Sequence, residues 1–129
     1  MAQKSIDNWL SLAEYDLATA QAMLQTKRLL YVAFMCQQAI EKILKAWYVK
    51  HRGTTPPYTH NLLRLIADMP WKDDVDSRML GTIETLNSCY LESRYTEDIE
   101  ELAAALTETR VNEVLESTRE LFGWIKLKL

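Results

Sequence analysis

Three polar residues recur at one helical spacing within residues 36–46, which read CQQAIEKILKA. Gln38, Lys42 and Lys45 stand at i, i+4 and i+7, so a helix would place them on one stripe. Lysine ammonium groups neutralise phosphate, which makes both lysines candidate ligands for an anionic group. The alternative is a solvated helix face on which Glu41 and Lys45 form an i, i+4 ion pair, which stabilises a helix only slightly.

Arg94 and Tyr95 form a second candidate phosphate-binding position, at the point where a predicted helix ends and an acidic stretch begins. Arg94 is a further candidate for binding phosphate, because a guanidinium group contacts a phosphate through several donors. Equally, Arg94 can neutralise the end of the helix and pair with Glu97 or Asp98. Both interpretations remain open from the sequence.

His60 follows Thr59, which we predict to be the N-cap of a short helix. A protonated histidine is disfavoured at the positive end of a helix dipole. We therefore expect a neutral ring that hydrogen-bonds to a neighbouring helix or loop, and the sequence favours a structural role over a functional one.

Two long helices must position these side chains. Apolar residues recur every three or four positions from residue 6 to 24, with Ser5 available as N-cap, and again from residue 29 to 46. The second helix should end at His51, Arg52 and Gly53, because Gly readily adopts the left-handed conformation that closes a helix. Its apolar face is wide, which predicts that it is the most buried element.

The rest of the chain predicts shorter connections and two further long helices. We expect the short helix to end near Met69 and Pro70, and Asp74 or Asp76 to start the next long helix. Residues 92–101 are strongly acidic and predict a solvated loop or a frayed turn. Thr107 should cap the last helix.

This pattern predicts an all-α fold: one domain over residues 1–129, built as an up-and-down antiparallel bundle of four long helices plus a short one. Trp47, Tyr48, Trp71 and Trp124 are large for so small a bundle, so we expect a homodimer that covers part of them. The alternative is that they complete the core of a monomer.

Composition limits the classes of function. The net charge of −3 argues against a general electrostatic grip on nucleic acid, although a local basic patch is compatible with it. Cys36 and Cys89 have no metal-binding spacing and are expected to be reduced core thiols, as in a cytoplasmic protein. No segment has the length and apolarity of a membrane span, and no Gly-rich phosphate loop or metal motif is present, so no membrane association, metal or cofactor is predicted.

Several separated motifs resemble the HEPN domain, the "higher eukaryotes and prokaryotes nucleotide-binding" family. They are the segment 36–46, then YTHNLLRL at 58–65, then Tyr90 and the SRY of residues 93–95, together with Trp9, Ala13, Asp16, Leu17 and Ala20 near the start. The resemblance covers nearly the whole chain. It implies a helical bundle, commonly dimeric, that works beside a minimal nucleotidyltransferase in a two-component or toxin–antitoxin pair.

Many HEPN members are ribonucleases whose Arg-x4–6-His motif binds the scissile phosphate and transfers protons. This sequence departs from that pattern, because no histidine follows Arg94. We therefore expect a non-catalytic subunit that binds nucleotide or RNA weakly through Lys42, Lys45 and Arg94. The alternatives are a ribonuclease toxin in which Arg94 and Tyr95 form a degenerate site, and a purely structural dimer.

Overall fold

The computed structural model describes residues 2–91 and 96–129 of the chain. Within these ranges the secondary structure is helical, with no strand. The elements are α1 (Ala2–Gln25), α2 (Leu29–Arg52), α3 (Leu62–Ala67), the 3-10 helix η1 (Lys72–Asp74), α4 (Ser77–Asn87), α5 (Thr96–Ala105) and α6 (Glu108–Lys126).

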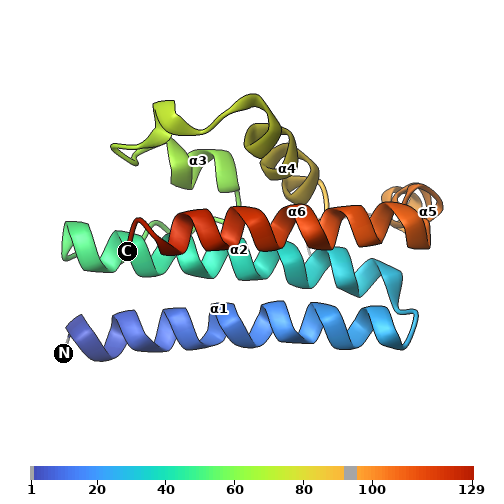
Figure 1. Ribbon diagram of the computed structural model, residues 1–129, viewed down its shortest axis with the longest axis horizontal. Helices are drawn as coiled ribbons and strands as arrows, with labels where there is room; N and C mark the ends of the chain where they lie inside the picture. Colours follow the sequence, from blue (N-terminus) through green and yellow to red (C-terminus); the bar gives the residue numbers. More distant parts are fainter. Residues whose placement is uncertain (1, 92–95) are drawn as a thin grey trace.

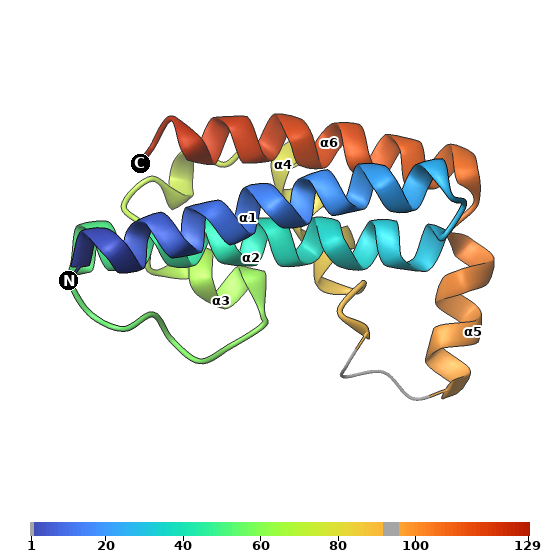
Figure 2. The same cartoon turned by 90° about the horizontal axis from the view of Figure 1, so that it is seen from below.

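Three long helices form the body of the bundle (Figure 1). Helix α2 runs antiparallel to α1, and α6 lies beside both of them (Figure 2). Helices α3 and α4 cover the side of α2 and α6 that faces away from α1, and α5 lies across one end of the bundle. The all-α bundle predicted from the sequence is therefore confirmed.

The core lies along α2, as its wide apolar face predicts. Fully buried residues line this helix on several sides, among them Val32, Ala33, Cys36, Ala39, Ile40, Ile43 and Leu44. Ala13 and Ala20 of α1 are also fully buried, and such small side chains allow α1 and α2 to approach closely. Cys36 and Cys89 are both free and buried, as expected.

Two of the predicted helix starts are wrong. Helix α1 begins at Ala2, so Ser5 lies inside it instead of capping it. Helix α3 is capped by Asn61 rather than Thr59: the Asn61 side chain accepts hydrogen bonds from the backbone N–H groups of Leu63 and Arg64. An Asn carboxamide satisfies the free N–H groups of a first turn as well as a Thr hydroxyl does, so spacing alone did not separate them.

Other predicted boundaries are confirmed. Asp76 caps α4, and Thr107 caps α6 by accepting a hydrogen bond from the Arg110 N–H group. Gly53 closes α2 in the left-handed conformation, with φ of 65°.

The acidic stretch, predicted as a solvated loop or a frayed helical turn, contains the start of a regular helix. Helix α5 begins at Thr96, and Glu97 and Asp98 lie in its first turn, where negative charge stabilises the helix dipole. Leu102 of α5 packs against the core, which helps to hold the helix in place.

Aromatic side chains gather at the end of the bundle opposite α5. The rings of Trp47 and Trp71 meet edge to face at 6.0 Å, and those of Trp71 and Trp124 at 5.2 Å. Trp47 and Trp71 are only 4% and 7% exposed within a single chain. These two residues therefore complete the monomer core and give no support to the homodimer, which stays a prediction.

None of the helices in the described ranges is both long enough and apolar enough to cross a membrane.

Candidate functional site

A buried polar row runs along α2. Gln37, Glu41 and Lys45 follow one another at four-residue intervals and are 0%, 3% and 6% exposed. The ion pair of Glu41 and Lys45 predicted from the sequence is present, with Nζ of Lys45 3.1 Å from Oε2 of Glu41. The pair is buried, however, so the predicted alternative of a solvated helix face is wrong for these two residues. A buried charge is costly unless it is fully paired, so this row depends on its partners.

Glu41 is the centre of the row because its carboxylate has three partners. Besides Lys45, its Oε1 atom lies 3.0 Å from Nδ1 of His60 and accepts a hydrogen bond of 3.2 Å from Nε2 of Gln37. The same Gln37 amide nitrogen donates to the backbone oxygen of His60 at 3.0 Å. The loop that carries His60 is thus attached to α2 through both its side chain and its backbone.

The His60 ring is held from its faces as well as from its edge. It stacks on the ring of Tyr90, with centroids 4.2 Å apart and planes 16° apart. Tyr58 meets it edge to face at 5.9 Å. The His60 side chain is still 38% exposed, and Nε2 makes no hydrogen bond within the described ranges. One edge of the imidazole is therefore fixed by a carboxylate, while the side chain remains partly exposed.

A cavity of about 270 Å³ opens beside this ring, lined by His60, Asn61, Asn87 and Tyr90. The Asn87 side chain accepts a hydrogen bond from the Leu62 N–H group at 2.8 Å and donates to Oδ1 of Asn61 at 2.8 Å. These bonds fix the amide groups that form the wall of the cavity. None of the lining residues in the described ranges is a lysine or an arginine.

The residues predicted to bind phosphate do not all meet here. Gln38 joins the row by donating to Oε1 of Gln37 at 2.7 Å. Lys45 lies over the ring of Trp9, 5.5 Å from its centroid, in addition to its ion pair. Lys42 turns toward α1 and pairs with the buried carboxylate of Asp16. Both lysines are therefore already matched by a carboxylate.

Arg94 and Tyr95, the other predicted phosphate ligands, lie outside the described residues.

Sequence reasoning missed the amide wall and the role of Tyr90 beside His60. Tyr90 and Asn61 lay in segments that carry the family resemblance, but no role was assigned to either, and Asn87 belonged to no motif. The misplaced cap contributed to this, because an N-cap at Asn61 directs its side chain toward the start of α3.

A family model described as "HEPN domain" matches residues 6–128 of the chain. The chain therefore belongs to the HEPN domain family, as the resemblance predicted.

Solved structures share the fold. TT1696 from Thermus thermophilus is similar with a TM-score of 0.78 and 26% identity, over 96% of this chain and 98% of that one. ST0689, an archaeal HEPN homologue, is similar with a TM-score of 0.71 and 20% identity, over 95% and 96% of the two chains. None of the curated proteins matches the chain.

Proposed function

We propose that this HEPN domain is a non-catalytic subunit that binds a nucleotide or an RNA nucleotide through its base and acts beside a minimal nucleotidyltransferase. The observation that carries the proposal is the His60 ring, which is fixed by Glu41 on one edge and lines a cavity with amide walls. Imidazole and carboxamide groups donate and accept hydrogen bonds in the plane of a ring, as recognition of a base edge requires.

The pairing of the α2 lysines supports binding over cleavage. A ribonuclease site must place a cation on the scissile phosphate beside the group that transfers protons. The α2 lysines are occupied by Asp16 and Glu41. The proposal therefore assigns base recognition to His60, with Asn61 and Asn87, and no chemistry to the lysines.

Incubation with the four ribonucleosides tests the binding function, because a nucleoside offers a base without a phosphate. A ligand that binds only the folded protein raises its melting temperature. We expect at least one nucleoside to raise it at millimolar concentration, and His60→Ala to abolish the rise. Leu127→Ala is the control, since Leu127 is 86% exposed at the end of α6 and is not among the described residues that line the cavity. No rise with any nucleoside would instead favour the purely structural dimer.

A ribonuclease is the second candidate, favoured by the Glu41–His60 pair. A carboxylate that orients one nitrogen of an imidazole is the arrangement that general acid–base catalysis uses. His60 would then supply the proton-transfer group that the sequence after Arg94 lacks. Cleavage of RNA without metal, lost in both His60→Ala and Arg94→Ala, would establish this candidate and overturn the non-catalytic one.

The assembly is also a proposal. Leu12, Tyr15 and Tyr31 are large side chains that are 48%, 71% and 52% exposed on α1 and α2, which supports a protein partner. Light scattering of the purified protein tests the homodimer, for which we expect twice the monomer mass. Co-purification with a nucleotidyltransferase encoded beside it tests the heteromeric partner.

A further inference from the structure

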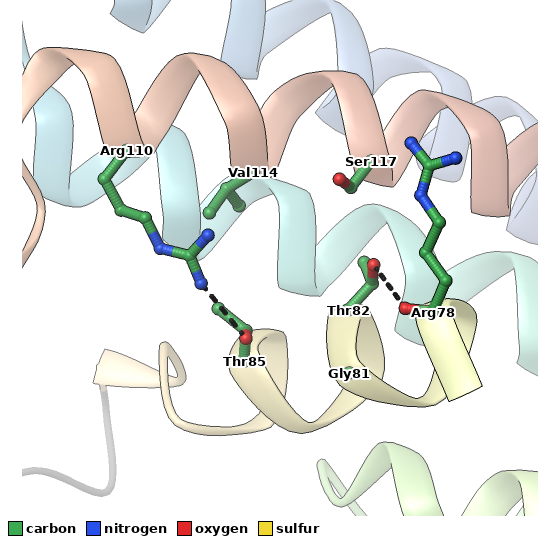
Figure 3. Close-up of a pocket in the computed structure, with 7 residues that line it drawn as sticks. All are labelled: Arg78, Gly81, Thr82, Thr85, Arg110, Val114 and Ser117. Carbon is green, nitrogen blue, oxygen red and sulfur yellow. Dashed lines mark hydrogen bonds between the residues drawn. The ribbon is translucent and has the colours of Figure 1, made fainter.

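A groove separate from the His60 cavity runs between α4 and α6 (Figure 3). Its volume is about 260 Å³. It is lined by Arg78, Gly81, Thr82 and Thr85 of α4, and by Arg110, Val114 and Ser117 of α6. The groove thus combines two guanidinium groups with three hydroxyl groups, in a protein whose net charge is negative.

The two arginines stand at opposite ends of the groove. On α4, Arg78, Thr82 and Thr85 form one stripe at i, i+4 and i+7. On α6, Arg110, Val114 and Ser117 form a stripe with the same spacing. The Arg110 guanidinium lies 3.5 Å from the Thr85 hydroxyl, whereas Arg78 lies near Ser117 (Figure 3). The helical rise of about 1.5 Å per residue separates positions 78 and 85 by about 10 Å.

Neither guanidinium is committed to a buried partner. Arg78 pairs with Glu120 at 3.1 Å and Arg110 with Glu113 at 3.4 Å, and the side chains of both pairs are 47% to 72% exposed. Exposed pairs of this kind contribute little and exchange readily for a stronger anion. The glutamates also limit the site, because they would repel a long polyanion that extended past the groove.

Gly81 lines the groove without a side chain that would occupy it. It lies inside α4, where Gly is less favourable for helix stability than Ala. A Cβ atom at this position would meet nothing within 4 Å, so close packing does not explain the residue.

We propose that the α4–α6 groove binds a small phosphorylated ligand that carries two phosphate groups, one held by Arg78 and the other by Arg110. The hydroxyl groups of Thr85 and Ser117 would donate hydrogen bonds to the ligand between them, and the Thr82 hydroxyl, which donates to the backbone oxygen of Arg78 at 3.2 Å, would accept one. Guanidinium groups bind phosphate through charge-assisted hydrogen bonds, and a cavity of this size accommodates a ligand no larger than a sugar bisphosphate. The site is independent of the proposed base recognition at His60.

The test uses phosphorylated sugars, which have no base and so do not depend on the His60 cavity. Binding of fructose 1,6-bisphosphate and ribose 5-phosphate is measured by calorimetry and thermal shift at constant ionic strength. We expect the bisphosphate to bind about tenfold more tightly, because it engages both arginines. Arg78→Gln and Arg110→Gln should each weaken bisphosphate binding about tenfold.

Two further variants test whether binding depends on the shape of the groove and whether it reflects only the general positive charge of the surface. Gly81→Leu should abolish binding by filling the groove without removing a charge. Arg64→Gln removes an exposed arginine of α3 outside the groove and should leave binding unchanged. The proposal is overturned if the bisphosphate does not bind at millimolar concentration, if it binds no better than the monophosphate, or if Arg64→Gln weakens binding as much as the groove variants do.

Discussion

Oε1 of Glu41, a carboxylate buried on α2, lies 3.0 Å from Nδ1 of His60, whose side chain is 38% exposed. The contact joins a buried charge of the core to a ring at the surface. Because Lys45 and Gln37 hold the same carboxylate, the orientation of the His60 ring depends on a row of residues along α2. The candidate site and the stability of the core are therefore coupled.

Loss of the Glu41 carboxylate should destabilise the fold strongly. Glu41→Gln leaves the buried ammonium group of Lys45 without a counter-charge, and breaking a buried pair in this way costs about 3–5 kcal/mol. Urea unfolding measures the loss. Glu41→Gln combined with Lys45→Met should recover most of it, since no unpaired charge then remains. Glu14→Gln, which breaks the exposed pair with Lys126, should cost less than about 1 kcal/mol. Equal losses for the buried and exposed pairs would contradict this account.

Asn61→Ala should destabilise more than the loss of an ordinary helix cap. Its side-chain oxygen accepts from the Leu63 and Arg64 N–H groups and from the Asn87 amide. A cap alone contributes about 1 kcal/mol, which is the loss expected for the control Thr107→Ala at α6. We expect a larger decrease in the free energy of unfolding for Asn61→Ala. A loss no greater than that of Thr107→Ala would show that the amide wall is not a structural unit.

Two glycines should respond to alanine with opposite signs. Gly53 has φ of 65°, so Gly53→Ala introduces strain at the end of α2 and should cost about 1 kcal/mol. Gly123 lies inside α6 with open space around the added Cβ, so Gly123→Ala should stabilise by about 0.5–1 kcal/mol. Thermal unfolding of the two variants measures both effects, and a shared sign would contradict the assigned backbone conformations.

The Cys36 thiol should make stability depend on alkaline pH. Burial raises its pKa from 9.0 to about 12, only partly opposed by a hydrogen bond with Thr118. Between these values the unfolded chain has lost a proton that the folded chain retains, so the free energy of unfolding falls as pH rises. The full contribution is present below pH 9. Its slope is at most about 1.4 kcal/mol per pH unit.

The Cys36→Ala variant isolates this effect from other groups that titrate at alkaline pH. Its free energy of unfolding should fall less steeply than that of the wild type across the same interval. Parallel curves for the two proteins would show that the thiol does not titrate as its burial implies.

Helical periodicity predicted the architecture because each long helix must present an apolar face to the core. The stripes of α1, α2 and α6 bury one face each, and Ala13, Ile43 and Leu115 lie in the core as a spacing of three and four residues indicates. Helix α5 was not predicted as a regular helix, because its charges suggested a solvated loop or a frayed helical turn. The same acidic residues stabilise the first turn of a helix when they lie at its N-terminus, and charge counting does not reveal that position.

The site was predicted only in part, because it is a tertiary arrangement. Glu41, Lys45 and His60 were recognised as polar residues of interest, but spacing along one helix does not tell which polar face is buried. The stacking of His60 on Tyr90 joins residues 30 positions apart, and the Arg110 guanidinium donates to the Thr85 hydroxyl across the groove between α4 and α6. Such contacts follow from how the helices pack and not from any local motif.

The most direct test of base recognition at His60 is a nucleoside titration followed by NMR of the histidine rings. The chain has two histidines, and His51 stacks on Trp47 outside the cavity, so it serves as an internal control. We predict that the His60 ring signals shift and saturate with at least one nucleoside, while the His51 signals stay fixed. His60 signals that do not move, or that move together with those of His51, would contradict the proposed function.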